Sequence, residues 1–177
     1  MPAAAFVEKL NEQIANEFAA SQQYIAVAIY YDAETLPRLA AFFYAQALEE
    51  RNHAMMMVRY LLDADEQPLI PAVAGPTNGF ADIVEPVAIA LEQEKKVTRQ
   101  IEQLTRVARE HSDFQSEQFV QWFLEEQVEE VATMGDLLRT VQRSVNDPMR
   151  AEEYLAREHA DAEAEDPTAP AAAGGAL

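Results

Sequence analysis

The chain has 177 residues, of which 49% are hydrophobic, and this length suits one domain with a sizeable core rather than two. Its 31 Asp and Glu against 13 Lys and Arg give a formal net charge of −18, which argues against non-specific binding to nucleic acid or to an anionic membrane and favours cations as ligands. The absence of cysteine excludes disulfides, thiolate metal sites and cysteine nucleophiles.

The N-terminal sequence MPAAAFVEKL lacks the basic start and the continuous apolar run of a signal peptide. The longest apolar run, YIAVAIYY, is far shorter than the ~20 residues that a membrane span needs. We therefore expect a cytoplasmic protein without a membrane partner.

The sequence predicts an all-α protein, because glycine is scarce and long stretches are rich in Ala, Leu, Glu, Gln and Met. A first helix over about 5–32 and a second over about 36–64 are joined by so few residues that we expect them to pack antiparallel. Pro37 falls in the first turn of the second helix, where its missing N–H is harmless. The following stretch, DEQPLIPAVAGPTNGF, is a predicted loop long enough to run the length of the bundle.

A third helix is predicted over about 81–110, where Pro86 is tolerable only near the start. The chain then turns, and a fourth helix runs over about 114–144. Either Ser112 or Asp113 is suited to cap its N-terminus.

Asp147 and Pro148 resemble an N-cap and first-turn pair that opens a short fifth helix, ending at about His159. The expected fold is thus an up-down four-helix bundle with one long crossover loop and a short fifth helix, over residues 1–160. Residues 161–177 are acidic, rich in Ala, Pro and Gly, and without an apolar period, so we expect a disordered tail.

Each long helix places polar residues inside its own apolar stripe. Residues seven positions apart lie on nearly the same face of a helix. In the second helix Glu50 lies in a column with Phe43 and Met57, and His53 lies in the neighbouring column. The other polar residues on core-facing columns are Glu17, Glu94, Gln127 and Glu130.

The spacing of these residues repeats along the chain. Glu17 lies 33 positions before Glu50, and Glu94 lies 33 positions before the matching residue of the fourth helix. The sequence therefore suggests two equivalent helical hairpins, each with one ligand-type residue on its first helix and an i, i+3 pair on its second. These pairs are Glu50 with His53 and Gln127 with Glu130.

Four carboxylates facing a low-dielectric interior would each cost several kcal/mol if charged and unpaired. Lys and Arg are scarce on these columns, so protons or bound cations must neutralise them. Oxygen ligands with a single imidazole suit a pair of ions such as Fe(II) or Mn(II). For one such residue alone a satisfied buried polar group is the commoner explanation, but the matched set of six favours a metal pair.

Further residues lie beside this set. Tyr24 follows Glu17 by seven positions and is interpreted either as a hydrogen-bond donor or electron source near the metals, or as an ordinary core aromatic. Simple packing is the preferred interpretation of Trp122. Three carboxylates about 100° round their helices form either an acidic lining beside the first site or a solvated face: they are Glu49, Glu126 and Glu129.

Glu17, Tyr24, EERNH at 49–53, Glu94 and EQVEE at 126–130 resemble the ferroxidase centre of non-haem bacterial ferritins, with a tail similar to the mycobacterial type. The resemblance covers about residues 5–160. It implies that Glu17, Glu50 and His53 hold one iron. It implies that Glu50, Glu94 and Glu130 hold the other, with Glu50 bridging and Gln127 close by. A third iron would lie between Glu49, Glu126, Glu129 and Glu130.

Two positions separate this chain from related families. Bacterioferritins have His in place of Glu130 and a haem-ligating Met in place of Arg51, so haem is not expected. Rubrerythrins have a cysteine-ligated iron module, which the absence of cysteine excludes. Mini-ferritins that protect DNA lack the short fifth helix and fit less well.

The resemblance implies a ferroxidase that oxidises Fe(II) with O2 or H2O2 and stores the mineral inside a hollow shell of 24 copies, with Asp113 and Glu117 as channel candidates. The alternatives are a soluble di-iron or di-manganese oxidase without storage, and a structural bundle whose acidic residues are only solvated. Flexible termini of similar ferritins can dock to a larger protein shell, and PAAAGGAL is a candidate for this role, although a plain disordered end is preferred.

Overall fold

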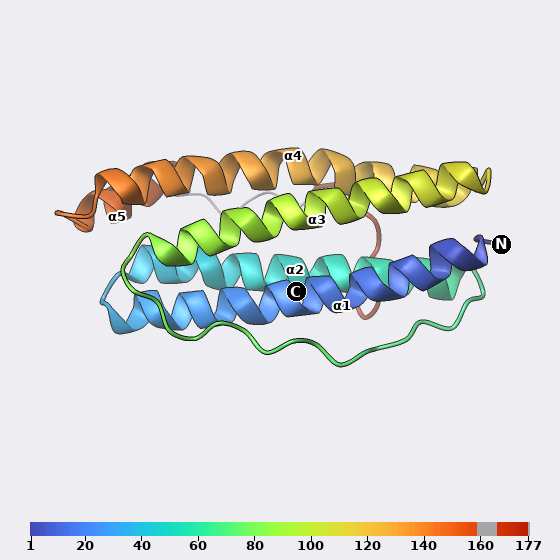
Figure 1. Ribbon diagram of the computed structural model, residues 1–177, viewed down its shortest axis with the longest axis horizontal. Coiled ribbons are helices and arrows are strands. Elements are labelled where there is room, and N and C mark those ends of the chain that lie inside the picture. The colour runs from blue at the N-terminus through green and yellow to red at the C-terminus, as the bar shows by residue number, and fades with distance from the viewer. Residues whose placement is uncertain (159–165, 177) are drawn as a thin grey trace.

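The computed structural model describes residues 1–158 and 166–176. Its elements are α1 (Ala4–Ala33), α2 (Pro37–Asp63), α3 (Glu85–Glu110), α4 (Phe114–Arg143) and α5 (Met149–Glu158). The long helices α1 to α4 lie alongside one another, with α5 at one end (Figure 1). No helix in the described part of the chain has both the length and the apolar character of a membrane span. The predicted all-α bundle with a short fifth helix is confirmed.

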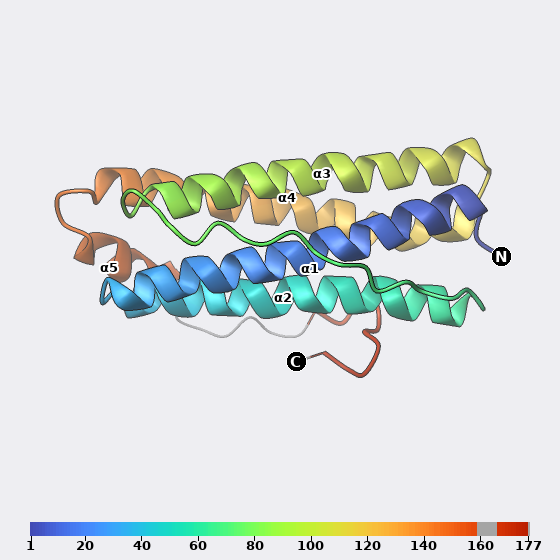
Figure 2. The ribbon, with the colours of Figure 1, turned by 60° about the horizontal axis from the view of Figure 1, so that its bottom comes forward.

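The long connection between α2 and α3 runs along α1 for most of the length of the bundle (Figures 1 and 2). Side chains of α1 hold it in place: Gln23 exchanges two hydrogen bonds with the backbone of Thr77, at 3.0 and 2.8 Å, and Asn11 accepts one from the Leu69 N–H at 2.7 Å. The connection therefore carries the chain back along the bundle, so that α3 starts beside the end of α1.

The start of α3 differs from the prediction, because the helix begins at Glu85 rather than near residue 81. The Asp82 carboxylate accepts hydrogen bonds from the Val84 and Glu85 N–H groups at 2.8 and 3.0 Å. This side chain closes a local turn that competes with the helix. Pro86 then occupies the first turn, where no backbone donor is needed.

Of the two predicted caps for α4, Asp113 is the one used, since its carboxylate accepts from the Ser116 N–H at 3.1 Å. The short fifth helix begins at Met149, two residues after the predicted cap Asp147. Its predicted end at His159 lies outside the described residues.

The buried side chains of the bundle form two apolar clusters with a polar zone between them. On α1, Ile14 belongs to one cluster and Tyr24 to the other. On α2, Ala47 and Ala54 belong to different clusters in the same way. Glu17 on α1, and Glu50 and His53 on α2, fall between these pairs in the sequence, so the fold places them near the middle of the bundle.

Helix α5 is attached to the start of α2 through a buried carboxylate. The two oxygens of Glu152 accept hydrogen bonds from the Arg38 and Leu39 N–H groups, each at 2.9 Å. The residue at the N-cap of α2, Leu36, offers no side-chain acceptor. Glu152 therefore supplies from α5 the cap that α2 lacks, where the helix dipole also favours a negative charge.

The described part of the C-terminal segment, 166–176, lies against α2 and α4. The Trp122 indole N–H donates to the Asp166 carboxylate at 2.8 Å, and the Ala173 N–H donates to the Met55 carbonyl at 3.0 Å. Residues 161–165 and 177, which belong to the tail predicted to be disordered, lie outside the described residues. The disorder of the tail stays a prediction. The sequence did not predict the contacts of residues 166–176 with α2 and α4.

Thr35 has a strained backbone at the end of α1, and replacing it with glycine is expected to stabilise the protein. Its φ is +60°, and the Leu36 N–H donates to the Tyr31 carbonyl at 2.9 Å, which forms the helix-ending motif that prefers glycine at this position. We expect Thr35→Gly to raise the free energy of unfolding by about 0.5–1 kcal/mol, measured by denaturant titration.

The matched control is Ala33→Gly at the last residue of α1. There the backbone is helical, so glycine should lower the free energy of unfolding by about 0.5–1 kcal/mol. A Thr35→Gly variant no more stable than the wild type would show that the left-handed conformation carries no strain.

Candidate metal centre

Six polar residues predicted to face the core are buried in the middle of the bundle. Their exposed fractions do not exceed 4%. They come from all four long helices: Glu17 from α1, Glu50 and His53 from α2, Glu94 from α3, and Gln127 and Glu130 from α4.

Glu17, Glu50 and His53 form the part of this centre in which carboxylate oxygens lack hydrogen-bond partners. Each offers one ligand atom, and these atoms all lie within 4.8 Å of one another. The Nδ1 atom of His53 is 3.5 Å from Oε2 of Glu50. Oε2 of Glu17 and Oε2 of Glu50 are buried and have no hydrogen-bond partner. Because unpaired buried carboxylate oxygens are costly, the two oxygens and the imidazole fit a divalent cation.

The opposite side of the centre is closed by hydrogen bonds to Glu94. The Tyr24 hydroxyl donates to its Oε1, and the Gln127 amide donates to its Oε2 at 3.3 Å. The Thr98 hydroxyl lies 2.9 Å from the Gln127 amide oxygen and 2.8 Å from the Glu94 carbonyl, and so fixes the amide. Both oxygens of Glu94 are therefore engaged, whereas Oε2 of Glu17 and Oε2 of Glu50 have no partner.

Burial dominates the electrostatics of the centre. Desolvation raises the pKa of Glu17 to about 7, raises the pKa of Glu50 well above its usual value, and raises that of Glu94. Burial lowers the pKa of His53 to about 4, so its imidazole is neutral at pH 7. The pKa of Tyr24 is raised well above its usual value by desolvation and then by the charge of Glu94. The metal-free centre therefore retains protons that a cation would displace.

The pKa of Glu50 depends on the charges of the other three buried carboxylates. After desolvation, the charges of Glu94, Glu17 and Glu130 are the next largest causes of its raised pKa. Glu50 therefore lies within reach of carboxylates from the other three long helices.

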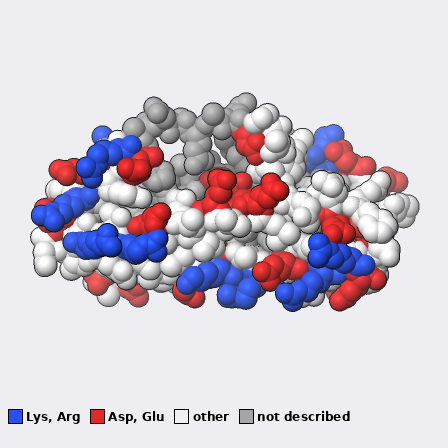
Figure 3. Space-filling view, turned by 90° about the horizontal axis from the view of Figure 1, so that it is seen from above, with Lys and Arg blue, Asp and Glu red and all other residues white. Residues whose placement is uncertain are grey.

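A second group of donor atoms lies beside the first and shares His53 with it. Glu49, His53 and Glu126 offer ligand atoms within 4.8 Å of one another, and the Gln46 amide donates to Glu49 at 2.6 Å. Glu129 is exposed. Among the described residues, neither donor group includes Glu129 or Glu130. Figure 3 shows acidic side chains gathered near the middle of the face seen from above.

Trp122 lies next to the first group. Its ring meets His53 edge-on with the ring centroids 5.5 Å apart, and it meets Phe123 in the same manner at 5.0 Å. The preferred interpretation of Trp122 as a packing residue fits these contacts, and the contact with His53 places it at the wall of the centre.

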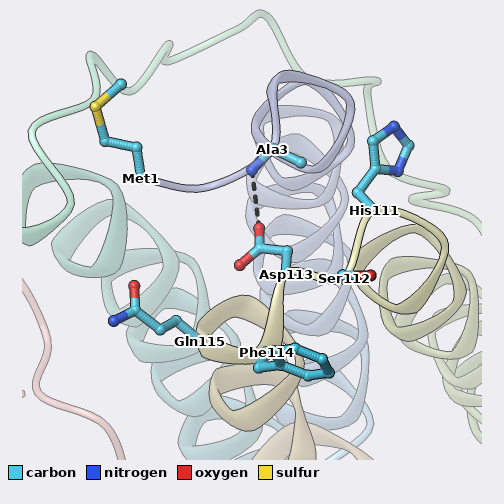
Figure 4. Close-up of a pocket in the computed structure, with 7 residues that line it drawn as sticks. All are labelled: Met1, Ala3, His111, Ser112, Asp113, Phe114 and Gln115. Carbon is cyan, nitrogen blue, oxygen red and sulfur yellow. Dashed lines mark hydrogen bonds between the residues drawn. The ribbon is translucent and has the colours of Figure 1, made fainter.

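The two residues considered as channel candidates are engaged within the chain. Asp113 lines a shallow depression of about 340 Å³ between the N-terminus and the α3–α4 turn (Figure 4), and its carboxylate accepts from the Ala3 N–H at 2.8 Å. Glu117 pairs with Arg109 at 2.7 Å. This depression does not include any residue of the centre.

Two residues that hold the centre in place are absent from the sequence-based set. Thr98 follows Glu94 by one helical turn, and Gln13 precedes Glu17 by one turn and donates to its Oε1 at 2.8 Å. The only signal for either in the sequence is the i, i+4 spacing from a core-facing glutamate.

Comparisons with known proteins agree with this arrangement. The family model described as the ferritin-like domain matches residues 7–144. Ferritin BfrB of Mycolicibacterium smegmatis is 54% identical over 168 residues, which cover 95% of this chain and 92% of that protein. Ferritin BfrB of Mycobacterium tuberculosis is 50% identical over 176 residues, 99% of this chain and 97% of that protein. A solved structure of an engineered closed form of Archaeoglobus fulgidus ferritin matches with a TM-score of 0.85 at 27% identity, over 93% of this chain and 100% of that chain.

Proposed function

The chain belongs to the ferritin-like family, and on that premise we propose that it stores iron, oxidising Fe(II) to Fe(III) at the buried centre. The observation that carries the proposal is the group formed by Glu17, Glu50 and His53, which offer ligand atoms within 4.8 Å of one another. Each of its carboxylates has one oxygen without a partner, and its imidazole is neutral at pH 7. Oxygen-rich sites with one imidazole suit iron, here the substrate of the reaction.

The first Fe(II) is expected to bind between Glu17, Glu50 and His53. Each of the two carboxylates has a buried Oε2 without a hydrogen-bond partner that an ion could use. The second Fe(II) would bind on the side of Glu94 and Glu130, where it must first displace the hydrogen bonds that Glu94 accepts. Glu50, which lies within reach of both sides, is the ligand the two ions would share.

The chemistry of the proposed reaction is a two-electron oxidation. Two Fe(II) ions each give up one electron, and H2O2 with two protons becomes two waters, or O2 with two protons becomes H2O2. The surrounding carboxylates stabilise the higher charge of Fe(III) and thereby favour oxidation. The Tyr24 hydroxyl, which donates to Glu94, lies where it can donate a hydrogen bond to the oxidant or to a carboxylate that binds the second ion.

Storage requires a hollow assembly, because the interior of a single bundle is filled by side chains. We propose a shell of 24 copies. Four large apolar residues on the α1–α2 hairpin support contact with further copies, since each is more than one-third exposed: Ile25, Ile29, Tyr44 and Leu48. Docking of the C-terminal tail to a larger protein shell stays a prediction.

An anaerobic titration with Fe(II) followed by air tests the oxidation step. We expect a fast absorbance change that saturates at about two Fe(II) per chain. No fast change would leave a structural bundle with solvated acidic residues as the better interpretation. Fast oxidation without further uptake would favour a di-iron oxidase that does not store iron.

Replacing Gln127 with Glu is expected to slow repeated turnover. The wild-type amide is a neutral residue beside the second ion and donates to Glu94 at 3.3 Å. A carboxylate in its place would bind Fe(III) more tightly, by about 10-fold, and so delay its departure. Oxidation of successive Fe(II) additions, followed by absorbance, measures this. Equal rates for variant and wild type on every addition would show that Gln127 does not control release.

A further inference from the structure

Gln13 is a buried amide one helical turn before Glu17. It is 2% exposed, and its Nε2 donates to Oε1 of Glu17 at 2.8 Å. The amide oxygen of Gln13 accepts from the Asn16 side chain at 3.1 Å. Since the amide has a partner at each end, its orientation is fixed, and the group facing Glu17 is a donor.

This contact makes the two oxygens of Glu17 unequal. Oε1 is held by Gln13, whereas Oε2 is buried without a partner and belongs to the side chain that shares the donor group with Glu50 and His53. Glu94, at the matching position of the other hairpin, has donors on both oxygens. Of these two matching residues, Glu17 is the one with one oxygen held and one oxygen without a partner.

We propose that Gln13 is a positioning residue for Glu17, which holds Oε1 and so presents Oε2 alone to the first metal ion. The inference rests on the proposed function. A carboxylate held in this way binds the ion through one oxygen in a fixed direction. Without Gln13 the carboxylate can rotate. It then loses conformational entropy when the ion binds, and this loss lowers the affinity for the ion.

Anaerobic titration of the full chain with Co(II), which is not oxidised by this treatment, tests the inference. In Gln13→Met, which keeps the length of the side chain but has no donor, we expect the first Co(II) to bind about 10-fold more weakly. The visible absorption bands of that first Co(II) should shift, because its carboxylate ligand takes another orientation. Binding of the second Co(II) should change by less than twofold.

A second variant, Asn16→Ala, keeps Gln13 but removes the bond that fixes its amide. Asn16 is only partly buried, so this change is compatible with folding. We expect a change of the same sign and smaller size in the affinity for the first Co(II), and this variant decides the matter if Gln13→Met does not fold.

Gln23→Met is the matched control, because Gln23 is also a buried glutamine of α1 but bonds the backbone of Thr77. It should lower the melting temperature without changing Co(II) affinity. A first-site affinity and spectrum equal to the wild type in both Gln13→Met and Asn16→Ala would overturn the inference alone. Failure of the wild type to bind Co(II) would overturn the proposed function as well.

Discussion

Glu50→Gln is expected to reduce the initial rate of Fe(II) oxidation by about 100-fold or more, since the outer partners of metal ligands alone are worth about 10- to 100-fold. Glu50 is 2% exposed, one of its oxygens has no partner, and it lies within reach of carboxylates from the other long helices. A neutral amide of the same shape cannot bridge two cations. The rate is measured from the absorbance after air is added to the Fe(II)-loaded protein.

The fold should survive this substitution. Burial and the neighbouring carboxylates raise the pKa of Glu50 well above its usual value, so a neutral amide replaces a group whose charged form the metal-free site disfavours. We therefore expect no fall in melting temperature for metal-free Glu50→Gln. The control is Glu102→Gln on α3, where the exposed carboxylate pairs with Arg106 at 3.2 Å and where the rate should not change. An oxidation rate of Glu50→Gln within twofold of the wild type would exclude Glu50 as the shared ligand.

The second large effect is expected from pH. Glu17 has a pKa of about 7, so below pH 7 a cation must displace its proton before it binds. Between pH 7.5 and 5.5 this residue alone should weaken the binding of the first Co(II) by about 20-fold. His53, with a pKa of about 4, takes up no proton in this range and does not add to the effect. Calorimetric titration in buffers of different ionisation enthalpy measures both the affinity and the protons released.

Because the pKa of Glu17 is raised, the stability of the protein should depend on pH in opposite directions without and with metal. Folded Glu17 holds its proton up to about pH 7, whereas unfolded Glu17 has the usual value of 4.5. The folded state therefore binds more protons between these values, and the stability of the metal-free protein falls as pH rises through 7. His53 acts in the opposite sense, and its contribution fades as the pH rises above its usual pKa of 6.5.

Between about pH 7 and 8 the carboxyl groups therefore dominate, because the unfolded imidazole is mostly neutral there. There the melting temperature should fall with pH without metal and rise with pH in saturating Co(II). Parallel pH profiles with and without Co(II) would contradict the account of a protonated centre.

The helical repeat was sufficient to predict the fold and the burial of the six polar residues. Glu17 and Glu94 fall on apolar columns, and a column position determines which way a helical side chain faces. Their roles as ligands stay predictions. The start of α3 at Glu85 was missed because the turn depends on the Asp82 carboxylate bonding its neighbours, which competes locally with the helix.

Contacts between side chains were beyond the reach of periodicity. Gln13 and Thr98 are ordinary residues for a helix, and only the positions of their polar atoms show that they hold Glu17 and Gln127. The contacts of residues 166–176 were equally hidden, because an Ala- and Pro-rich segment has no apolar period that would predict packing. The carboxylate of Asp166 instead receives the indole N–H of Trp122.

The mass of the native particle and its iron content after aerobic loading test the central claim most directly. The chain has a mass of 19.8 kDa, so 24 copies give roughly 475 kDa. We predict a particle of this size that takes up many more than two iron ions per chain. A monomer or dimer that retains no more than two iron ions per chain would contradict iron storage.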